Sequence, residues 1–392
     1  MRALVWNGVN DLATETVPDP RLINPTDAIV RVTATVTCGS DLHLLAGYVP
    51  FTRHGDVLGH EFVGEIVEVG SEVRDRRVGE RVVVSSFVAC GTCWQCRQGN
   101  FSLCDNGNPN PGITEALWGF APGGCFGYSH AMGGYGGSHA EYIRVPYVDV
   151  GAFPIPEEVP ELRALFASDA AATGWMGADL GEVGPGDTVA VWGAGGVGLM
   201  AARSAQIRGA AQVVMIEPRQ DRRRFAEDWL GVTTLHPREI GEGLLELTAG
   251  RGPDIAIEAV GMEAAADTGV QAAMDRAGQA LRIQTERATG VREAIYHCRK
   301  GGTVVILGVF AAWANRFPLG ALMNKGLTLR SAQVHGQRYV PALLDLMARG
   351  ELDTERMVTH ELGLEQGAEA YRLFQHKDDG CLRSVIRPHG RA

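Results

Sequence analysis

The sequence predicts an α/β protein of two domains, one built on a doubly wound parallel sheet and the other rich in β-strands. Two observations lead to this prediction. Between residues 161 and 335, helical and strand segments alternate, as they do when crossover helices connect parallel strands. Before residue 160, short strands rich in Val, Thr and Gly alternate with frequent turns. The segment after residue 335 is expected to return to the β-rich domain, which then comprises residues 1–160 and 336–392.

Length and composition fit such a protein and exclude some classes of partner. The 392 residues are 45% hydrophobic and 21% charged, which is ordinary for a globular protein. A net charge of −10 argues against a nucleic-acid surface, and no apolar run is long enough to cross a membrane. The chain starts in a predicted strand, without the pattern of a signal peptide. We therefore expect a cytoplasmic protein that binds neither nucleic acid nor membrane.

Strands of the β-rich domain alternate apolar and polar residues with period two, which is typical of half-buried antiparallel strands. The clearest are Ala28–Thr37, Phe62–Val69 and Arg81–Val84. Between Pro109 and Gly137 the chain is unusually rich in Gly and Pro. Near its end, a helix is expected at Val340–Ala348 and a strand at Cys381–Ile386.

The parallel-sheet domain can be followed element by element. Its predicted strands are Thr188–Trp192, Gln212–Glu217, Asp254–Ala259 and Thr303–Leu307. Its predicted helices are Leu199–Arg208, Asp221–Leu230 and Ile240–Thr248. The segment between Met262 and Arg299 is longer than one crossover helix requires, so we expect it to carry an insertion.

A glycine-rich turn follows the first of these strands, with Gly193, Gly195 and Gly198 standing as G-x-G-x-x-G. Such glycines let the backbone approach a pyrophosphate, and the N-terminus of the next helix directs free N–H groups at the phosphates. The second strand ends on Glu217, nineteen residues after Gly198, where a carboxylate accepts hydrogen bonds from an adenosine ribose. The pattern predicts dinucleotide binding; the alternative is a tight turn that binds nothing. Further candidate contacts, in this loop and after two later strands, are Gly196, Val197, Val260, Gly261 and Gly308.

Four of the eight cysteines fall within fifteen residues, as Cys90, Cys93, Cys96 and Cys104. In a reducing compartment this spacing indicates metal binding, and four thiolates complete a tetrahedral zinc site without water. Adjacent glycines let the backbone fold around the ion. Such a site is structural, because it leaves no position for a substrate. Reduced surface thiols and an iron–sulfur cluster are the alternatives.

A second, more dispersed set of metal-binding side chains lies nearer the N-terminus. Cys38, Ser40 and His43 stand at a predicted strand-to-helix turn, and His60 and Glu61 precede the next strand. One thiolate, one imidazole and one carboxylate can hold a catalytic zinc and leave its fourth position for water or substrate. Taken singly, Cys38 is typical of a small core residue and His60 of a structural histidine, so spacing alone leaves both interpretations open.

The order of these motifs resembles that of the zinc-dependent medium-chain alcohol dehydrogenases. The shared features are Cys-Gly-Ser-Asp-Leu-His at 38–43, Gly-His-Glu at 59–61, the four-cysteine loop and the glycine-rich turn, and they span essentially the whole chain. Other segments look closest to the formaldehyde dehydrogenase subgroup, including its glutathione-independent members; examples are Phe126–His130, Ala140–Pro146 and Met323–Leu327. The resemblance implies a Rossmann domain at 161–335 and a discontinuous GroES-like catalytic domain around it.

Carried over residue by residue, the resemblance makes Cys38 and His60 ligands of a catalytic zinc. Many relatives use a cysteine as the third ligand, but the matching segment here reads Ala-Ser-Asp-Ala-Ala-Ala-Thr-Gly at 167–174. The subgroup uses the aspartate of this segment, so the resemblance implies Asp169 as the third ligand. Taken alone, Asp169 would be an ordinary carboxylate at a helix start.

The same resemblance assigns five further residues. Glu61 can enter the zinc coordination shell when water or product leaves. Ser40 is expected to contact the substrate oxygen and His43 to pass its proton to solvent; the alternative for both is a capping role on the following helix. Arg222 is expected beside the adenosine ribose and Arg383 at the pyrophosphate.

The activity implied is oxidation of a primary alcohol or aldehyde hydrate by hydride transfer to NAD, with formaldehyde as the favoured substrate. Two zinc ions per chain follow, one catalytic and one structural. Glu217 favours NAD because a carboxylate there repels the 2′-phosphate of NADP, although Arg219 and Arg222 weaken this preference slightly. The 109–137 stretch resembles an insertion that covers the adenine side of the dinucleotide and retains it; the alternative is a surface Ω-loop.

Two other functions are kept as alternatives. One is a polyol or amino-alcohol (threonine-type) dehydrogenase of the same fold. The other is a relative that has lost zinc chemistry and acts as a quinone reductase or a nucleotide-binding protein. The joint presence of Cys38, Ser40, His43 and His60 disfavours this second alternative. Relatives form dimers or tetramers, so a homodimer or homotetramer is expected.

Overall fold

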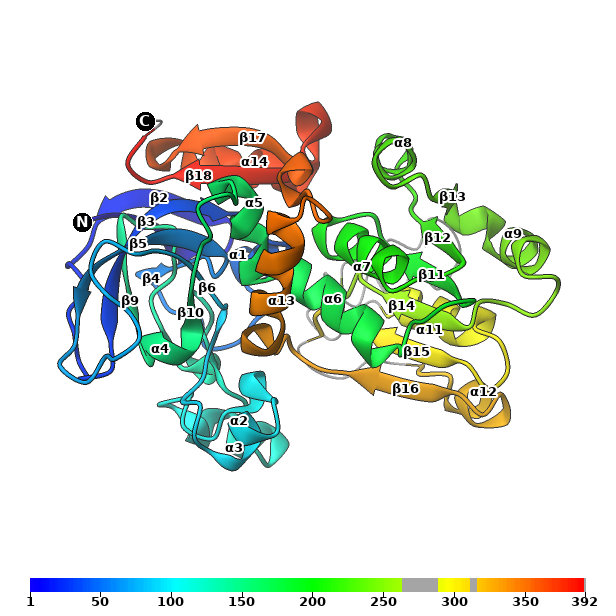
Figure 1. Cartoon of the computed structure of the whole chain (residues 1–392), viewed down its shortest axis with the longest axis horizontal. Coiled ribbons are helices and arrows are strands. Elements are labelled where there is room, and N and C mark those ends of the chain that lie inside the picture. The colour runs from blue at the N-terminus through cyan, green and yellow to red at the C-terminus, as the bar shows by residue number, and fades with distance from the viewer. Residues whose placement is uncertain (263–287, 311–315, 391–392) are drawn as a thin grey trace. The chain divides into compact units, whose positions relative to one another are not determined.

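In a computed structural model the chain forms two compact units (Figure 1). The first comprises Met1–Ala172 and Val334–Ala392, and the second comprises Thr173–Gln333. The structure describes residues 1–262, 288–310 and 316–390. Most of the insertion expected between residues 262 and 299 lies outside these described residues.

The first unit extends to Ala172, and not only to residue 160, because two short helices lengthen it. They are α5 (Glu161–Leu165) and the 3-10 helix Phe166–Ser168, and both pack on strands of the β-rich sheet. The next helix, α6 (Ala170–Leu180), begins in the first unit and ends in the second.

The first unit is built around the long strand β3 (Ala28–Val36). It pairs in antiparallel register with β5 (Phe62–Val69), β9 (Tyr142–Val145) and β18 (Arg383–Arg387). Because β18 follows the second unit in the sequence, this sheet joins the two ends of the chain. The sheet order is β10-β6-β5-β3-β18-β17, where β10 is Ala152–Pro154, β6 is Arg81–Val84 and β17 is Val358–Gly363.

Smaller elements complete this unit. A second sheet has the order β2-β1-β4, from Asp11–Thr16, Arg2–Gly8 and Asp56–Val57, and a third pairs β7 (Phe87–Val88) with β8 (Gly124–Cys125). Its other α-helices are α1 (Gly39–Leu45), α2 (Trp94–Arg97), α3 (Pro111–Trp118), α4 (Val148–Gly151), α13 (Gly336–Ala348) and α14 (Gly367–His376).

Apolar side chains on the inner face of the large sheet form the core of the first unit. Val30 and Val32 of β3, and Phe62 and Ile66 of β5, are fully buried in it. The rings of Phe62 and Phe126 pack edge to face, with centroids 5.7 Å apart. This contact anchors the loop after β8 against the start of β5, directly beside the predicted ligand His60.

The second unit is a six-stranded, fully parallel sheet in the order β13-β12-β11-β14-β15-β16. The order reverses between β11 and β14, which is where open sheets of this kind bind ligands. The strands are β11 (Thr188–Trp192), β12 (Gln212–Ile216), β13 (Thr233–Leu235), β14 (Ile255–Glu258), β15 (Thr303–Ile306) and β16 (Thr328–Ser331). The described helices are α7 (Gly196–Ile207), α8 (Gln220–Leu230), α9 (Ile240–Leu247), α11 (Thr289–His297) and α12 (Leu319–Asn324).

Helices cover the parallel sheet as the alternation of its side chains requires. Ala190, Trp192 and Val214 belong to one buried cluster with side chains of α9 and α11. The helix after the glycine-rich turn, α7, packs on β11, β12 and β14 and lies in front of the sheet in Figure 1. The sequence-based prediction of a parallel α/β domain with a β-rich partner is therefore confirmed.

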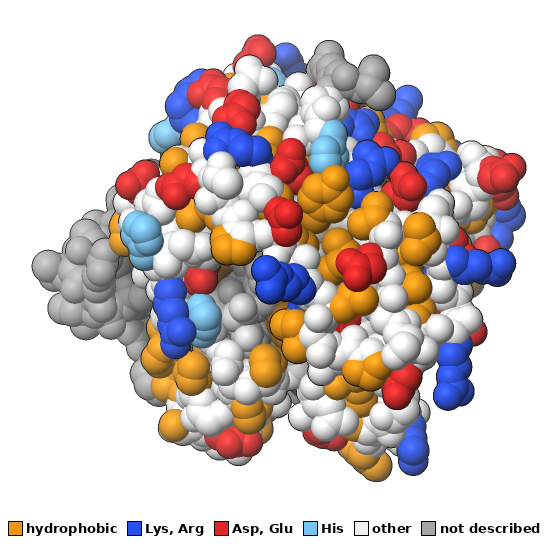
Figure 2. Space-filling model, turned by 90° about the vertical axis from the view of Figure 1, so that its left-hand side faces the viewer, with side chains coloured by type: hydrophobic (Ala, Val, Ile, Leu, Met, Phe, Trp, Pro, Cys, Tyr) orange, Lys and Arg blue, Asp and Glu red, His pale blue; other side chains and the backbone are white. Residues whose placement is uncertain are grey.

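Two observations concern nucleic acid and membranes, the partners that the sequence argues against. Figure 2 shows acidic and basic side chains interspersed over the described part of the face that it presents, without a broad basic field. None of the helices in the described ranges combines the length and hydropathy that a bilayer span requires.

Candidate active site and metal centres

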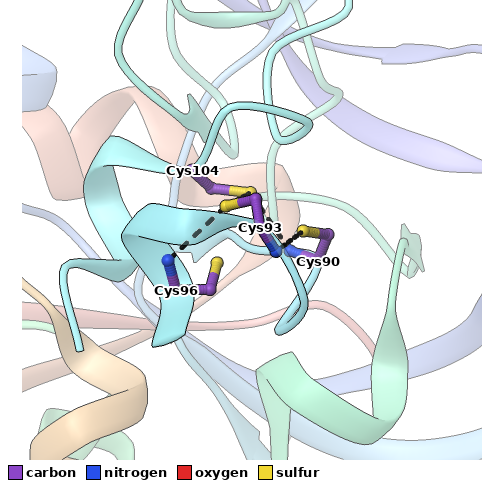
Figure 3. Close-up of side chains that lie close together, drawn as sticks. All are labelled: Cys90, Cys93, Cys96 and Cys104. Carbon is purple, nitrogen blue, oxygen red and sulfur yellow. Dashed lines mark hydrogen bonds between the residues drawn. The ribbon is translucent and has the colours of Figure 1, made fainter. Parts of the chain in front are cut away.

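The four clustered cysteines converge in the first unit, as the spacing predicts (Figure 3). Their sulfurs all lie within 4.8 Å of one another, and Cys93 Sγ is 3.9 Å from Cys104 Sγ. Tetrahedral zinc with bonds of about 2.3 Å places its sulfur ligands about 3.8 Å apart. The donor set therefore fits a zinc ion, which Cys90, Cys93, Cys96 and Cys104 would hold.

Hydrogen bonds favour the thiolate at Cys90, whereas burial raises the pKa of the Cys104 thiol to about 11. Burial alone would raise the pKa of the Cys90 thiol, but hydrogen bonds from Thr92, Asn106 and Cys93 lower it to about 6. The backbone turns through the left-handed region at Gly91 and Gly99, where φ is +75° and +80°. Both glycines thus permit the bends that bring the sulfurs together.

A second cluster brings together Cys38, His60 and Asp169, whose ligand atoms also lie within 4.8 Å of one another. Cys38 precedes α1, His60 precedes β5, and Asp169 lies between the 3-10 helix Phe166–Ser168 and α6. His60 Nε2 is 3.2 Å from Asp169 Oδ2. One thiolate, one imidazole and one carboxylate fit a zinc ion and leave one coordination position open.

Asp41 orients two of these ligands, and sequence reasoning assigned it no role. Its Oδ2 accepts a hydrogen bond from the backbone N–H of Cys38 at 2.8 Å, and its Oδ1 lies 3.1 Å from His60 Nδ1. The carboxylate is fully buried. A metal-binding histidine with a carboxylate behind its second nitrogen has a defined tautomer and ring orientation. The position of Asp41, three residues after Cys38 in the first turn of a helix, was a usable signal.

Ser40 touches the cluster, and His43 lies farther along the same helix. The Ser40 hydroxyl is 3.4 Å from Cys38 Sγ and 3.3 Å from His60 Nε2. His43 is buried on α1, three residues on and therefore on the same side of the helix as Ser40. This arrangement is compatible with the predicted proton relay, which stays a prediction.

Glu61 and Arg383 form a buried pair within the first unit. Arg383 donates a hydrogen bond to Glu61 Oε2, and Ala170 N donates to Oε1 at 3.0 Å. The guanidinium also lies over the ring of Phe166, 5.3 Å from its centroid. Burial raises the pKa of Glu61 to about 7, against the opposing charge of Arg383. The expected contact of Arg383 with a pyrophosphate stays a prediction; its described partner is Glu61.

The glycine-rich turn of the second unit has the conformation that its pattern predicts. Gly193 has φ of +95°, and a Cβ on Gly198 would lie 2.0 Å from the Gly193 carbonyl oxygen. By contrast, a Cβ on Gly195 would meet only Arg222 Nη1, at 3.9 Å. Gly193 and Gly198 are thus required by the turn itself, whereas Gly195 leaves open space. Such space at a helix N-terminus fits a dinucleotide pyrophosphate.

Glu217 closes this loop from the neighbouring strand. Its Oε2 accepts a hydrogen bond from Ala194 N at 2.9 Å and its Oε1 one from Arg219 N at 2.9 Å. The carboxylate is buried beside the glycine-rich turn. Arg222 approaches the same turn, as the distance to Gly195 shows. The structure therefore brings both predicted ribose-side residues to one loop.

Val260, Gly261 and Gly308 meet at the ends of β14 and β15, around a residue that sequence reasoning missed. Glu258 Oε1 accepts hydrogen bonds from Val260 N at 2.9 Å and from Gly261 N at 2.8 Å. Gly308 N donates to the Glu258 backbone carbonyl at 3.2 Å. Burial raises the pKa of the Glu258 carboxyl to about 7, although these amide bonds oppose the shift.

Two residues of the Gly-rich 109–137 stretch lie next to the cluster of Cys38, His60 and Asp169. The Tyr128 ring stands edge-on to the His60 ring, with centroids 6.3 Å apart. Cys125 is close enough to interact electrostatically with His60 and Asp169, while burial raises the pKa of its thiol to about 12. Neither was predicted, because glycine-rich sequence gives no periodic signal for which side chains point inward.

The same stretch carries an exposed aromatic pair. Trp118 and Phe120, at the end of α3, stack with centroids 6.1 Å apart and are 42% and 55% exposed. The base of the loop is fastened: Asn108 Nδ2 donates to Ala131 O at 2.9 Å, and His130 Nε2 lies 3.1 Å from Asp56 Oδ1. The stretch is therefore a structured loop that exposes two aromatic side chains.

Comparison with known proteins agrees with this fold and these clusters. Residues 24–157 match the model of the alcohol dehydrogenase GroES-like domain, and residues 196–287 match that of the zinc-binding dehydrogenases. The fold and the two metal-binding clusters thus define a zinc-binding dehydrogenase, an oxidoreductase. More particularly, the chain belongs to the zinc-type alcohol dehydrogenase family.

Three relatives show the extent of the likeness. A zinc-type alcohol dehydrogenase-like protein of Schizosaccharomyces pombe is 34% identical over 387 residues, 98% of this chain and 90% of that protein. The solved alcohol dehydrogenase TADH from Thermus sp. ATN1 is 35% identical, with a TM-score of 0.82 over 99% of each chain. The glutathione-independent formaldehyde dehydrogenase of Pseudomonas aeruginosa is 36% identical over 282 residues, 67% of this chain and 66% of that protein.

Proposed function

We propose that the protein is an NAD-linked, zinc-dependent dehydrogenase that oxidises a primary alcohol or an aldehyde hydrate. The observation that carries this proposal is the contrast between the two clusters. Four cysteines make a closed set, whereas Cys38, His60 and Asp169 supply only three ligands, and the Ser40 hydroxyl lies beside two of them. A three-ligand set of this composition suits a catalytic zinc.

The ligand residues and their neighbours have distinct roles in this proposal. Cys38, His60 and Asp169 would hold a zinc ion, which would supply a Lewis acid for lowering the pKa of the substrate hydroxyl. The hydroxyl of Ser40, beside two of these ligands, accepts the proton that the substrate gives up, and His43 passes it on. Glu61 lies next to His60 in the sequence and is a reserve ligand.

NAD is the proposed hydride acceptor, and Glu217 supports it over NADP. Its carboxylate lies at the glycine-rich turn, where it can accept the ribose hydroxyls and where a 2′-phosphate would meet a like charge. Further cofactor contacts are proposed for the loop 193–198, for Val260, Gly261 and Gly308, and for Arg222 and Arg383. A titration in which NADP⁺ binds more tightly than NAD⁺ would refute the preference.

Formaldehyde is the favoured substrate. Support comes from the likeness to a formaldehyde dehydrogenase and from the matching segments Phe126–His130 and Ala140–Pro146. The alternatives within the fold are a polyol and an amino alcohol of the threonine type.

We also propose that the 109–137 loop, with its exposed Trp118 and Phe120, covers the adenine side of NAD and slows its release. Protein purified without added cofactor and free of nucleotide would contradict this.

Self-association and location are proposed on separate grounds. Among the described residues β16 is an edge strand of the parallel sheet. Leu329 on this strand and Leu319 and Met323 on α12 are exposed. Exposed apolar groups along a sheet edge favour pairing with a second copy, so a homodimer or homotetramer is proposed. Light scattering would test it. The clustered free cysteines suit a reducing, cytoplasmic location.

One experiment tests the whole proposal. NADH production is followed by absorbance with formaldehyde, simple primary alcohols, polyols and threonine as substrates. Zinc is counted in the same preparation. Two zincs per chain are expected, with activity lost in Cys38→Ala and in Asp169→Ala. Cys298→Ala removes a buried cysteine outside both clusters and serves as the control. One zinc per chain, with no activity on any of these substrates, would favour the zinc-inactive alternative.

A further inference from the structure

A buried glutamate at the end of β14 holds the backbone of two proposed cofactor contacts. Glu258 is the last residue of this strand and is fully buried. Its Oε1 accepts hydrogen bonds from the backbone N–H groups of Val260 and Gly261, at 2.9 and 2.8 Å. Amides that leave a sheet need another acceptor, and the Glu258 side chain supplies it. The chain after β14 is therefore closed into a tight turn by its own side chain.

The turn that Glu258 closes lies against the glycine-rich turn. A Cβ on Gly193 would lie 2.9 Å from Val260 Cγ2 and 3.3 Å from the Ala259 carbonyl oxygen. A Cβ on Gly198 would lie 3.7 Å from Ala259 Cβ. The strands that lead into the two turns, β11 and β14, are neighbours at the point where the order of the sheet reverses. The backbone that Glu258 holds is therefore beside the loop proposed for the pyrophosphate.

Two glycines from other segments enclose the Glu258 carboxyl group. A Cβ on Gly290 of α11 would lie 2.8 Å from its Oε1, and a Cβ on Gly308 would lie 2.4 Å from its Oε2. The atoms that the Gly290 Cβ would meet all belong to the Glu258 side chain. Added volume at Gly290 would therefore push Oε1 away from the two amides that it accepts.

We propose that Glu258 is a positioning residue for the dinucleotide: its bonds to Val260 and Gly261 set the backbone against which the cofactor binds. Glu258 does this as a hydrogen-bond acceptor of the right length, and not through its charge. An amide oxygen at the same reach can replace it, whereas a shorter carboxylate cannot. The inference rests on the proposed binding of NAD at the loop 193–198.

The test compares Glu258→Gln with Glu258→Asp in a titration of NADH followed by its fluorescence. Gln keeps the length of the side chain and can leave a carbonyl oxygen on both amides. Asp keeps the carboxylate but is one methylene group shorter, so its oxygens withdraw from them. We expect the dissociation constant of NADH to stay within about twofold of wild type in Glu258→Gln and to rise about tenfold in Glu258→Asp. The zinc content should be unchanged in both variants.

A glycine variant displaces the carboxyl group without altering it. Gly290→Ala places a methyl group 2.8 Å from Glu258 Oε1, at a helical position where Ala is a better helix former than Gly. We expect weaker NADH binding in this variant, and a smaller further loss when Gly290→Ala is added to Glu258→Asp, whose side chain leaves room. Gly241→Ala on α9, where a Cβ meets nothing within 4 Å, should leave the affinity unchanged.

Two results would overturn the inference. The first is a wild-type NADH affinity in folded Glu258→Asp. The second is an equal loss in Glu258→Asp and Glu258→Gln, which would assign the effect to the charge. If Glu258→Asp does not fold, equal affinities of Gly290→Ala and Gly241→Ala for NADH would overturn the inference in its place. A wild-type protein that binds no NADH would instead refute the proposed function itself.

Discussion

Glu258 offers a sharp test of how burial acts on a charge in the dinucleotide unit. Its Oε1 accepts both amide bonds, from Val260 and Gly261, while its Oε2 is buried and makes no hydrogen bond within the described residues. Glu258→Gln can therefore keep its carbonyl oxygen on the two amides and lose only the ionisable group. We expect this variant to change the pH dependence of stability without disrupting the loop.

The magnitude follows from the pKa of this carboxyl group. Burial raises it from 4.5 to about 7 in the folded protein. A difference of about 2.5 pH units corresponds to about 3 kcal/mol. Because the folded-state pKa is the higher one, the contribution to stability is fully present below pH 4.5 and is lost as the pH rises through 7. Wild type should therefore lose up to about 3 kcal/mol across this window through Glu258 alone.

Thermal unfolding at pH 5 and pH 8 measures the effect as a difference between variant and wild type. We expect similar midpoints at about pH 5 and a variant midpoint higher by up to about 10 °C at pH 8, since 1 kcal/mol shifts a domain of this size by about 2–4 °C. Glu242→Gln removes an exposed carboxylate from α9 and serves as the control. Parallel pH profiles for Glu258→Gln and wild type would refute the reasoning. They would mean that the Glu258 carboxyl has the same pKa in the folded and the unfolded protein.

Three further predictions address the glycine turn, the cysteine cluster and the cofactor preference. Gly198→Ala should destabilise the second unit, because its Cβ would lie 2.0 Å from the Gly193 carbonyl oxygen. Gly195→Ala should instead fold normally and lose NAD affinity. Calorimetry measures the first effect and NADH fluorescence titration the second. Cys96→Ser should lower the zinc content by one ion per chain and lower the unfolding midpoint; retention of both ions would disprove the four-sulfur site. Glu217→Ala should weaken NAD binding about 10- to 100-fold and NADP binding much less, and equal losses for the two would argue against its role in discrimination.

Features encoded in contiguous sequence could be predicted directly. The turn at Gly193–Gly198 is set by steric limits between residues a few positions apart, and its conformation followed from the pattern. The cysteine loop is equally local, since its four sulfurs come from one short segment. Asp169 differs: it meets Cys38 and His60 only in three dimensions, and it was identified through family resemblance and not from spacing.

Contacts between distant segments could not be predicted. Tyr371 reaches His139 across more than two hundred residues, and neither position carries a periodic or motif signal. The pairing of Arg383 with Glu61 had no signal in the sequence, although a buried carboxylate requires a compensating charge; the expected contact of Arg383 with a pyrophosphate stays a prediction. The sequence assigned no role to Glu258, because the strand pattern does not show that its carboxylate turns back to the amides of Val260 and Gly261.

The pairing of β3 with β18 has a consequence for the order in which the protein matures during synthesis. Every residue of the second unit leaves the ribosome before β17, α14 and β18 are made. The parallel sheet can therefore complete its folding early, as domains generally do when they emerge. In the large β-rich sheet, by contrast, β9 can already pair with the first residues of β3, but Thr35 and Val36 stay without their partner strand on that edge until β18 is made. Arg383 lies on β18, so the buried Glu61 beside the predicted ligand His60 receives its ion-pair partner only after that strand has been made.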